Sequence, residues 1–164
     1  MSPPEASYDR ALVHRVAGAL RRIGRHYFRA EVEGLHHLPA GGFLGVGTHN
    51  GSVMMPDMFL WFAHYYQEHP HTPLYVLAHD LLSKGGALAR AAARLGAVRA
   101  EPSAAERLLA AGARVMVYPG GDFDAEKPFH ARHRVEFAGR TGYARVAVRA
   151  GVPICPVVSV GSGR

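Results

Sequence analysis

The sequence predicts an α/β fold, with a mostly parallel central sheet flanked by helices and preceded by a basic amphipathic helix. Two observations support this class. Short apolar runs typical of buried strands alternate along the chain with longer segments of helical periodicity. The 164 residues also suffice for one core but not comfortably for two. We therefore expect an N-terminal helical region over residues 1–29 and one α/β domain over residues 30–164.

The N-terminal helix is predicted from Tyr8 to about Arg29. Within it, apolar residues recur at steps of three and four with arginines between them, which gives an amphipathic helix with a basic polar face. The apolar set is Leu12, Val16, Leu20, Ile23 and Tyr27, and the basic set is Arg15, Arg21, Arg22, Arg25 and Arg29. Two compatible roles stay open. The helix packs on the rest of the chain with a solvated arginine face, or that face contacts anionic lipid headgroups.

The rest of the chain is predicted to alternate strands with helices. Strands are expected at residues 30–35, 43–48, 74–78, 114–118 and 154–160. One helix is expected to begin at Pro56, and others to cover residues 85–96 and 142–151. A further helix is expected from an N-cap at Ser103, with Glu106 in the capping-box position. Residues 97–103 and the charged stretch 122–140 are expected loops, and a loop as long as the second usually serves a site.

Charge and composition bound the partners. The formal net charge of +6, with eleven histidines in reserve, suits an anionic partner such as nucleic acid, a phospholipid surface or a phosphorylated substrate. The chain has no nucleic-acid-reading motif and no zinc-type histidine spacing, so we expect neither nucleic acid nor a metal. The lone Cys155 excludes an internal disulfide and is expected to be a small buried thiol. Without a secretory signal or a membrane-spanning apolar stretch, the protein is expected to be cytoplasmic and peripheral on a membrane.

The first candidate catalytic stretch is "GTHNGSVMMPD", residues 47–57. His49 directly follows an apolar strand, so a rigid element positions its imidazole, and Gly51 permits a sharp turn. A lone histidine is more often structural than catalytic. Asp57, however, stands at the start of the next helix, where it is suited to orient the ring and to stabilise an imidazolium. We interpret the pair as a general base with its acidic partner.

The second candidate stretch is "VMVYPGGDFDAEKPF", residues 115–129. Gly120 and Gly121 follow a strand, so their backbone N–H groups have no Cβ between them and a phosphate or a developing oxyanion. A simple tight turn is the alternative interpretation. The stretch matches neither a P-loop nor a dinucleotide-binding fingerprint. Since ligands of open α/β sheets bind at the carboxyl ends of the strands, we expect both stretches to share one site.

Four segments in order resemble the glycerolipid (lysophospholipid) acyltransferase family, particularly its diacylglycerol-acyltransferase-like branch. They are "THNGSVMMPD", "LGAVRAEP", "VMVYPGGDFDAEKPF" followed by "GRTGYARVAVRAG", and "VPICPVV". The resemblance covers roughly Tyr27 to Gly161. It implies an O-acyltransferase of lipid metabolism, in particular phospholipid biosynthesis. Such an enzyme moves a fatty acyl group from an acyl thioester to a hydroxyl of a glycerolipid or lysophospholipid. The thioester, acyl-CoA or acyl carrier protein, is a co-substrate, and no other cofactor is implied.

The resemblance also assigns roles to residues of this chain. It makes His49 the general base and Asp57 the acid that holds it. Acceptor binding falls to Arg99, which would contact acceptor phosphate, and to Gly120, Gly121 and, more loosely, Asp124. The implied partners are therefore the acyl thioester, the lipid acceptor and an anionic membrane surface.

The sequence departs from the family pattern in three ways. Seven residues separate His49 from Asp57 where the family commonly has four, so either the turn is expanded or another acid holds the ring. Pro-Gly-Gly stands where phospholipid-forming members usually have Pro-Glu-Gly, which favours the diacylglycerol-acyltransferase-like branch. The sequence also stops soon after the fourth segment, so we expect the acyltransferase-like domain to be incomplete at its C-terminus. The alternative function is a non-catalytic, membrane-surface lipid-binding module of the same fold.

Overall fold

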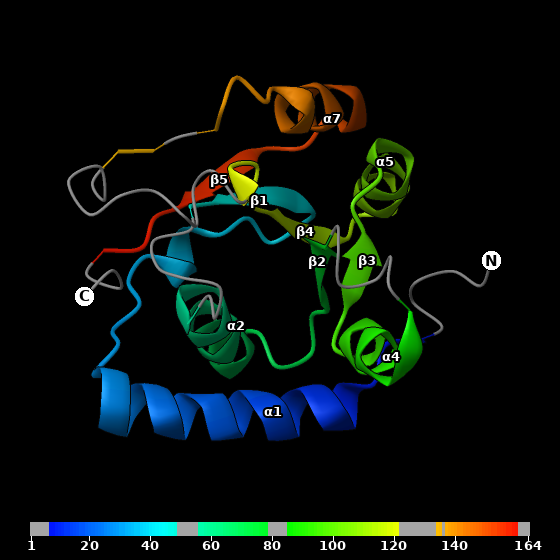
Figure 1. Cartoon of the computed structure of the whole chain (residues 1–164). Coiled ribbons are helices and arrows are strands. Elements are labelled where there is room, and N and C mark those ends of the chain that lie inside the picture. Colours follow the sequence, from blue (N-terminus) through cyan, green and yellow to red (C-terminus); the bar gives the residue numbers. More distant parts are fainter. Residues whose placement is uncertain (1–6, 49–55, 79–84, 122–133, 136, 161–164) are drawn as a thin grey trace.

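The computed structural model describes residues 7–48, 56–78, 85–121, 134–135 and 137–160 (Figure 1). These residues form one five-stranded sheet of order β3-β2-β4-β1-β5, in which every pair of neighbours is parallel. The strands are β1 (Phe43–Gly47), β2 (Leu74–Ala78), β3 (Ala97–Arg99), β4 (Arg114–Val117) and β5 (Ile154–Val157). All five carboxyl ends therefore lie along one edge of the sheet. The predicted α/β class with a parallel sheet is confirmed.

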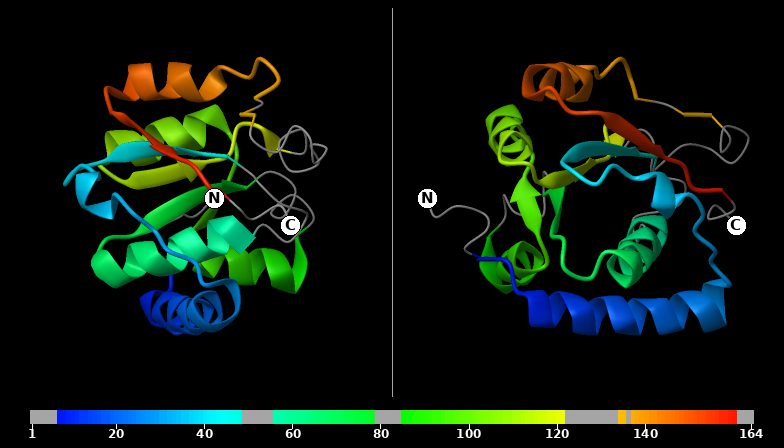
Figure 2. Two further views of the ribbon diagram at one scale, coloured as in Figure 1. Left: turned by 90° about the vertical axis from the view of Figure 1, so that its left-hand side faces the viewer. Right: turned by 180° about the vertical axis from the view of Figure 1, so that it is seen from behind.

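Helices cover both faces of this sheet (Figures 1 and 2). Helices α5 (Pro102–Ala110) and α7 (Gly142–Ala150) lie on one face. The other face carries α2 (Pro56–Glu68) and α4 (Gly86–Arg94), and α1 (Arg10–Ile23) crosses beneath both in Figure 1. Successive side chains of a strand point to opposite faces, so each central strand supplies two cores. Leu44 faces the α5/α7 core, whereas its neighbour Phe43 faces the α1/α2 core.

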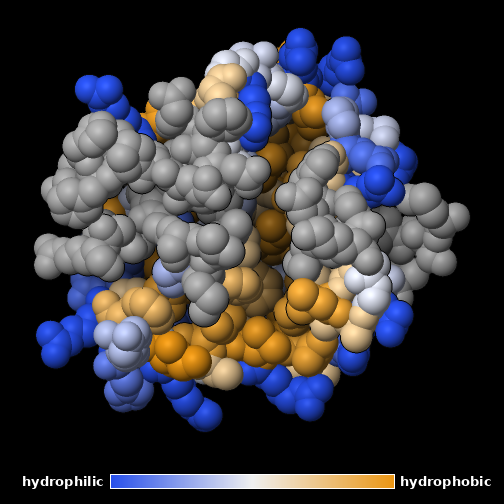
Figure 3. Space-filling view, viewed as in Figure 1, coloured by the Kyte–Doolittle hydropathy of each residue, from blue (hydrophilic) through white to orange (hydrophobic). Residues whose placement is uncertain are grey.

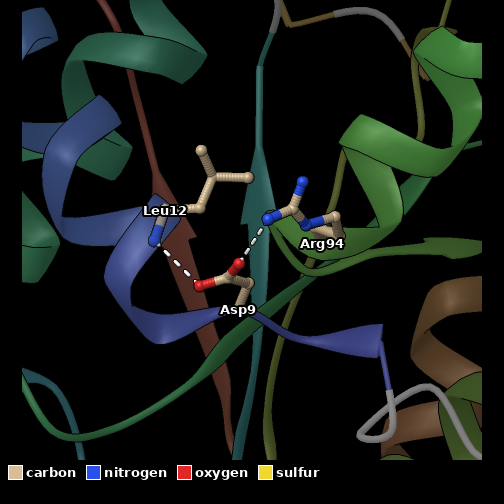
Figure 4. Close-up of polar contacts among 3 residues, drawn as sticks. All are labelled: Asp9, Leu12 and Arg94. Carbon is tan, nitrogen blue, oxygen red and sulfur yellow. Dashed lines mark hydrogen bonds and ion pairs between the residues drawn. The ribbon is translucent and has the colours of Figure 1, made fainter.

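Helix α1 begins at an N-cap that also ties it to α4. The Asp9 carboxylate accepts the Leu12 N–H at 3.0 Å and contacts the Arg94 guanidinium at 2.5 Å (Figure 4). The hydrogen bond from Leu12 and then that from Arg94 lower the pKa of Asp9, because both favour the charged carboxylate. At its other end α1 runs into a π-helical turn, Gly24–Phe28. Gly24 permits this packing, since a Cβ there would stand 2.5 Å from a methyl carbon of Leu60 on α2.

Three local predictions differ from the structure. Residues 30–34 have no regular structure and a 3-10 turn follows at Leu35–His37, because Gly34 turns the chain with a left-handed φ of 79°. A strand was expected there. The expected loop after Gly96 begins with β3, which at three residues is too short to show a periodicity. Helix α5 begins at Pro102 rather than after Ser103, and its N-cap Glu101 makes no side-chain capping bond. Proline at the first helical position sets the start here.

Strand β5 lies at the edge of the sheet formed by the described residues. The Leu44 N–H donates to the Pro153 carbonyl at 3.0 Å, and the Thr48 N–H to the Val157 carbonyl at 3.2 Å. Every second residue of β5 thus directs its backbone N–H and C=O toward β1. The residues in between, including Pro156, direct their backbone groups away from β1. Cys155 is half-buried rather than fully buried as expected, and its partial burial against the α1/α2 core raises the pKa of its thiol.

Candidate active site

The carboxyl ends of β1 and β4 lie side by side. The two strands pair in parallel with Val46 opposite Val117, so Thr48 and Tyr118 leave neighbouring strands at the same edge. The stretch that holds His49 and the stretch that holds the glycine turn therefore emerge next to each other, as in other parallel sheets where the ligand lies beyond the strand ends. His49 itself lies outside the described residues, and so does Asp124.

Gly47, the last residue of β1, leaves space for the ring of Tyr118. A Cβ on Gly47 would stand 2.3 Å from a ring carbon of Tyr118 and 2.8 Å from the methyl carbon of Met116. Real side-chain atoms do not approach so closely, so only glycine fits here while the tyrosine ring keeps this position. The Tyr118 side chain also packs against the α1/α2 core.

Asp57 is a buried acid at this edge. It is the second residue of α2 and is only 9% exposed, so a helix N-terminus favours its negative charge while the surrounding protein excludes most of the water. Its charge reaches Tyr118: burial raises the pKa of that phenol, and the Asp57 carboxylate raises it further. The structure thus brings together Asp57 and the start of the glycine turn. It offers a fixed acid of the kind that can orient an imidazole.

The glycine turn is closed by its own backbone. The Gly121 N–H donates to the Tyr118 carbonyl at 3.3 Å, and Gly121 adopts a left-handed φ of 51°. The predicted pair of ligand-facing N–H groups is therefore unequal, because the Gly121 N–H serves the turn, whereas the Gly120 N–H is not used in this closing bond. Pro119 and Gly120 are buried, so the turn is shielded from water.

Arg140 holds this turn from outside. Its Nη1 donates to the Pro119 carbonyl at 3.1 Å and to the Gly120 carbonyl at 3.2 Å. A Cβ on Gly121 would stand 2.8 Å from the same nitrogen and would displace the guanidinium, and the left-handed φ of 51° also favours glycine here. Arg140 is not among the site residues predicted from the sequence. A single arginine near two glycines shows no periodicity that would mark it as functional. Its position in the segment "GRTGYARVAVRAG" is the only sequence signal that points to it.

Arg99 lies on the same edge but at a distance from the turn. It ends β3, and β2 separates β3 from β4 in the sheet. Its Nε lies 3.1 Å from Glu101 Oε1, and its side chain is 61% exposed. The predicted site residues therefore divide along the edge: Asp57, Gly120 and Gly121 gather around the ends of β1 and β4, and Arg99 stands two strand positions from β4.

The described parts of the chain contain no group of three or more His, Cys, Asp or Glu side chains arranged to hold a metal ion. Among the helices that the structure describes, none is long and apolar enough to cross a membrane.

A parallel sheet with a buried acid and a braced glycine turn at its carboxyl edge defines an α/β protein whose ligand site lies at the strand ends. The family model "Acyltransferase" matches residues 29–160, nearly the whole α/β portion. The chain therefore belongs to the acyltransferase family. The predicted broad family is thereby confirmed, and the family match indicates a domain that transfers acyl groups.

The curated relatives come from mycobacteria and are themselves described as uncharacterized. The chain is 33% identical over 144 residues to an uncharacterized protein of Mycobacterium tuberculosis. This alignment covers 87% of the chain and 40% of the relative. It is 34% identical over 145 residues to an uncharacterized protein of Mycobacterium leprae, covering 87% of this chain and 39% of that protein. The chain thus spans about two fifths of the length of these relatives. No solved structure matches it significantly.

Proposed function

We propose that the protein transfers a fatty acyl group from an acyl thioester, acyl-CoA or acyl carrier protein, to a hydroxyl of a glycerolipid or lysophospholipid. The observation that carries this proposal is the buried Asp57 beside Tyr118, at the carboxyl edge of a chain that belongs to the acyltransferase family. In this proposal His49 is the general base and Asp57 orients its ring. The Pro-Gly-Gly sequence favours the diacylglycerol-acyltransferase-like branch.

The reaction proceeds by attack of the acceptor oxygen on the thioester carbonyl. His49 removes the hydroxyl proton as the new C–O bond forms, and the carbonyl oxygen becomes an oxyanion. The Gly120 N–H is suited to stabilise that oxyanion, because the closing bond of the turn does not use it. The C–S bond then breaks, and the thiolate takes the proton from the imidazolium. Asp57 stabilises the imidazolium between the two steps.

The acceptor is proposed to extend along the carboxyl edge toward β3. Arg99 would meet acceptor phosphate there, with Gly121 and Asp124 nearer the reacting hydroxyl. The Arg99–Glu101 ion pair is exposed, so exchange of the carboxylate for a phosphate costs little. With a phosphorylated acceptor, Arg99→Ala is expected to raise KM and leave kcat nearly unchanged.

The direct test uses a full-length form with labelled acyl-CoA or acyl carrier protein and a panel of lipid hydroxyls. We expect product from the parent, and a loss of about 100-fold or more in kcat from His49→Ala or Asp57→Asn. Transfer by His49→Ala at the parental rate would exclude the base assignment. Lipid binding without turnover by the parent would favour the alternative, a non-catalytic lipid-binding module.

Helix α1 supports a peripheral location on an anionic membrane, facing the cytoplasm. Beside the buried stripe of α1, a second apolar stripe at helical spacing runs along α1 and into the π-helical turn after it. We name it the α1 flank: Leu12, Val16, Ile23 and Tyr27. Ile23 is 50% exposed and Tyr27 is 79% exposed. Figure 3 looks onto the carboxyl edge of the sheet and shows a hydrophobic belt over α1 on this side. Arg15 and Arg22 of α1 are exposed and lie next to these positions along the helix.

This combination suits insertion of the α1 flank between lipids, with the arginines at anionic headgroups. The carboxyl edge would then face the bilayer from which the acceptor comes. Ile23→Asp is expected to weaken binding to vesicles of phosphatidylcholine and phosphatidylglycerol by about tenfold, as expected for one apolar side chain. The matched control is Val148→Asp, because Val148 is 80% exposed on α7, on the opposite face of the sheet. Equal weakening by both variants, or by neither, would exclude the α1 flank as the contact.

A further inference from the structure

Arg140 contacts two consecutive peptide units of the glycine turn. Its Nη1 donates to the Pro119 carbonyl at 3.1 Å and to the Gly120 carbonyl at 3.2 Å. In a trans peptide the C=O and the following N–H point in opposite directions. When both carbonyls point toward Arg140, the N–H groups of Gly120 and Gly121 must therefore point away from it. The arginine fixes the direction in which the turn can donate.

The two N–H groups then differ in what they can do. The Gly121 N–H donates to the Tyr118 carbonyl and closes the turn. The Gly120 N–H is directed by the same arginine but is not used in that bond. A cation on the carbonyl side also polarises the peptide, which makes its N–H a stronger donor. A positively charged guanidinium is thus suited both to aim and to strengthen this one donor.

The position of Arg140 is itself fixed by the chain before it. The Arg140 N–H donates to the Phe137 carbonyl at 2.8 Å, which closes a turn through Ala138 and Gly139. Ala138 has a φ of 49°, a left-handed conformation that is unfavourable for a residue with a Cβ. Phe137 anchors this turn, since its ring packs edge-on against Tyr143 of α7 at 5.7 Å between centroids and joins the α5/α7 core.

We propose that Arg140 is a positioning residue that aims the Gly120 N–H at the oxyanion of the acyl-transfer transition state. This inference rests on the proposed acyl transfer and adds a residue to it. Arg140 touches neither the acyl group nor the acceptor in this role, because it acts through the peptide planes of Pro119 and Gly120. The interaction strengthens when the carbonyl oxygen becomes negative, so its loss falls on kcat.

Kinetics of variants test this role. Arg140→Ala is expected to lower kcat by about 10- to 100-fold with less than a threefold change in KM, as for loss of one oxyanion donor. Arg140→Lys keeps one charged nitrogen that can bridge both carbonyls and is expected to recover most of the loss. The matched control is Arg149→Ala, because Arg149 is an exposed arginine of α7 that contacts Glu106 and not the turn. Binding of a thioether analogue of acyl-CoA, which develops no oxyanion, should be unchanged in all three variants.

Gly121→Ala provides a second route to the same contact. Its Cβ would stand 2.8 Å from Arg140 Nη1, so the substitution should displace the guanidinium and reproduce the loss of kcat seen in Arg140→Ala. Because both changes remove one interaction, the double variant is expected to be no slower than the slower single variant. Additive losses in the double variant would contradict a shared contact.

Amide hydrogen exchange tests the turn without any turnover. Arg140→Ala should increase exchange of the Gly120 and Gly121 amides, and Arg149→Ala should leave it unchanged. An inactive parent would refute the proposed function, and the exchange measurement would still decide whether Arg140 orders the turn. A parental exchange pattern in Arg140→Ala, or a kcat within twofold of an active parent, overturns the inference. So does an equal loss in affinity for the thioether analogue, because that would make Arg140 a ground-state binding residue.

Discussion

Two arginines make the same kind of contact at opposite ends of β4. Arg114, its first residue, uses Nη2 to bind the carbonyls of Pro39 and Ala40 at 3.2 Å and 3.1 Å. Arg140 uses Nη1 to bind the carbonyls of the Pro-Gly turn that follows the strand. Each arginine thus holds a proline and the residue after it. The difference lies in exposure, since Arg114 is 5% exposed and Arg140 is exposed.

The surroundings of each arginine explain what it can do. Arg114 also donates to the Tyr65 hydroxyl at 3.0 Å, and its guanidinium lies 5.6 Å and 5.8 Å from the ring centroids of Phe43 and Tyr65. Oxygens and aromatic faces surround this cation, at the amino end of the sheet where no ligand is expected. Arg140 stands at the carboxyl end, beside a turn with a donor to direct. The Arg114 contacts lie within the fold, and we propose that the Arg140 contacts serve the site, so that the end of the strand distinguishes the two roles.

The largest expected effect tests the stabilising end. Arg114→Met is expected to lower the free energy of unfolding by about 2–4 kcal/mol, because it removes charged hydrogen bonds and leaves buried oxygens without a donor. Urea denaturation of the variant and the parent measures this loss. Activity per folded molecule should stay near the parental value. A stable but inactive Arg114→Met would refute the division between the two ends.

Alkaline stability compares tyrosines at both ends. Burial raises the pKa of Tyr66 near the amino end and that of Tyr118 at the carboxyl end, where Asp57 adds to the rise. A raised folded-state pKa gives stability that is present below the unfolded value near pH 10 and lost as the pH rises above it. Each phenol should contribute a slope of up to about 1.4 kcal/mol per pH unit.

Denaturation midpoints measured from pH 8 to pH 11 give that slope. The upper limit lies about one pH unit above the ordinary tyrosine pKa. Tyr118→Phe keeps the ring against Gly47 and removes one titrating hydroxyl, so its slope should be shallower than that of the parent. An unchanged slope would mean that Tyr118 ionises in the folded protein much as it does in the unfolded chain.

A glycine substitution tests the packing of the carboxyl end. Gly47→Ala places a Cβ 2.3 Å from the Tyr118 ring, and we expect an overpacking cost of about 1–3 kcal/mol together with lower activity. Gly18→Ala is the matched control, because Gly18 lies within α1 and a Cβ there meets nothing within 4 Å. That change should stabilise the protein by about 0.5–1 kcal/mol. Two equally tolerated alanines would show that the Gly47 contact is not tight.

The smallest expected effect lies away from both ends. Asp9→Asn keeps the capping oxygen for the Leu12 N–H but loses the charge that faces Arg94, so we expect a fall in Tm of about 1–2 °C at neutral pH. Because the pKa of Asp9 is lowered in the folded protein, its contribution is present above the unfolded value and disappears as the pH falls through the folded value. The Tm difference should therefore shrink in acid. A difference that persists at low pH would have another cause.

Much of this fold was predictable from local sequence patterns. Buried parallel strands are continuous apolar runs, and β1, β2 and β4 are predictable because each is such a run between turn residues. Pro56 and Gly151 mark the start of α2 and the end of α7 as predicted, because proline fixes a helical φ and glycine readily takes the left-handed φ of 65° that ends a helix. The short β3 was missed, since three residues carry no period and only the pairing with β2 makes them a strand.

The site was predictable where a residue's role depends on its own segment. Asp57 and the glycine turn follow strands or open helices, so the topology of a parallel sheet brings them to one edge. Arg140 acts on carbonyls about twenty residues earlier in the chain, and no local pattern reports such a contact. The two roles of the turn amides were hidden for the same reason, because a sequence does not state which N–H closes a turn.

Pro156 has a consequence for the outer side of β5. Its backbone faces away from β1, and a proline has no N–H to give to an added strand. A second chain that tried to extend the sheet at this edge would find a carbonyl at that position and no donor. Exposed apolar side chains flank it, Ile154 at 41% and Val158 at 65%. Within the part of the chain that the structure describes, the proline thus leaves the outer side of β5 without a donor at a position flanked by exposed apolar side chains, which is one of the ways an outer strand is kept from pairing with another chain.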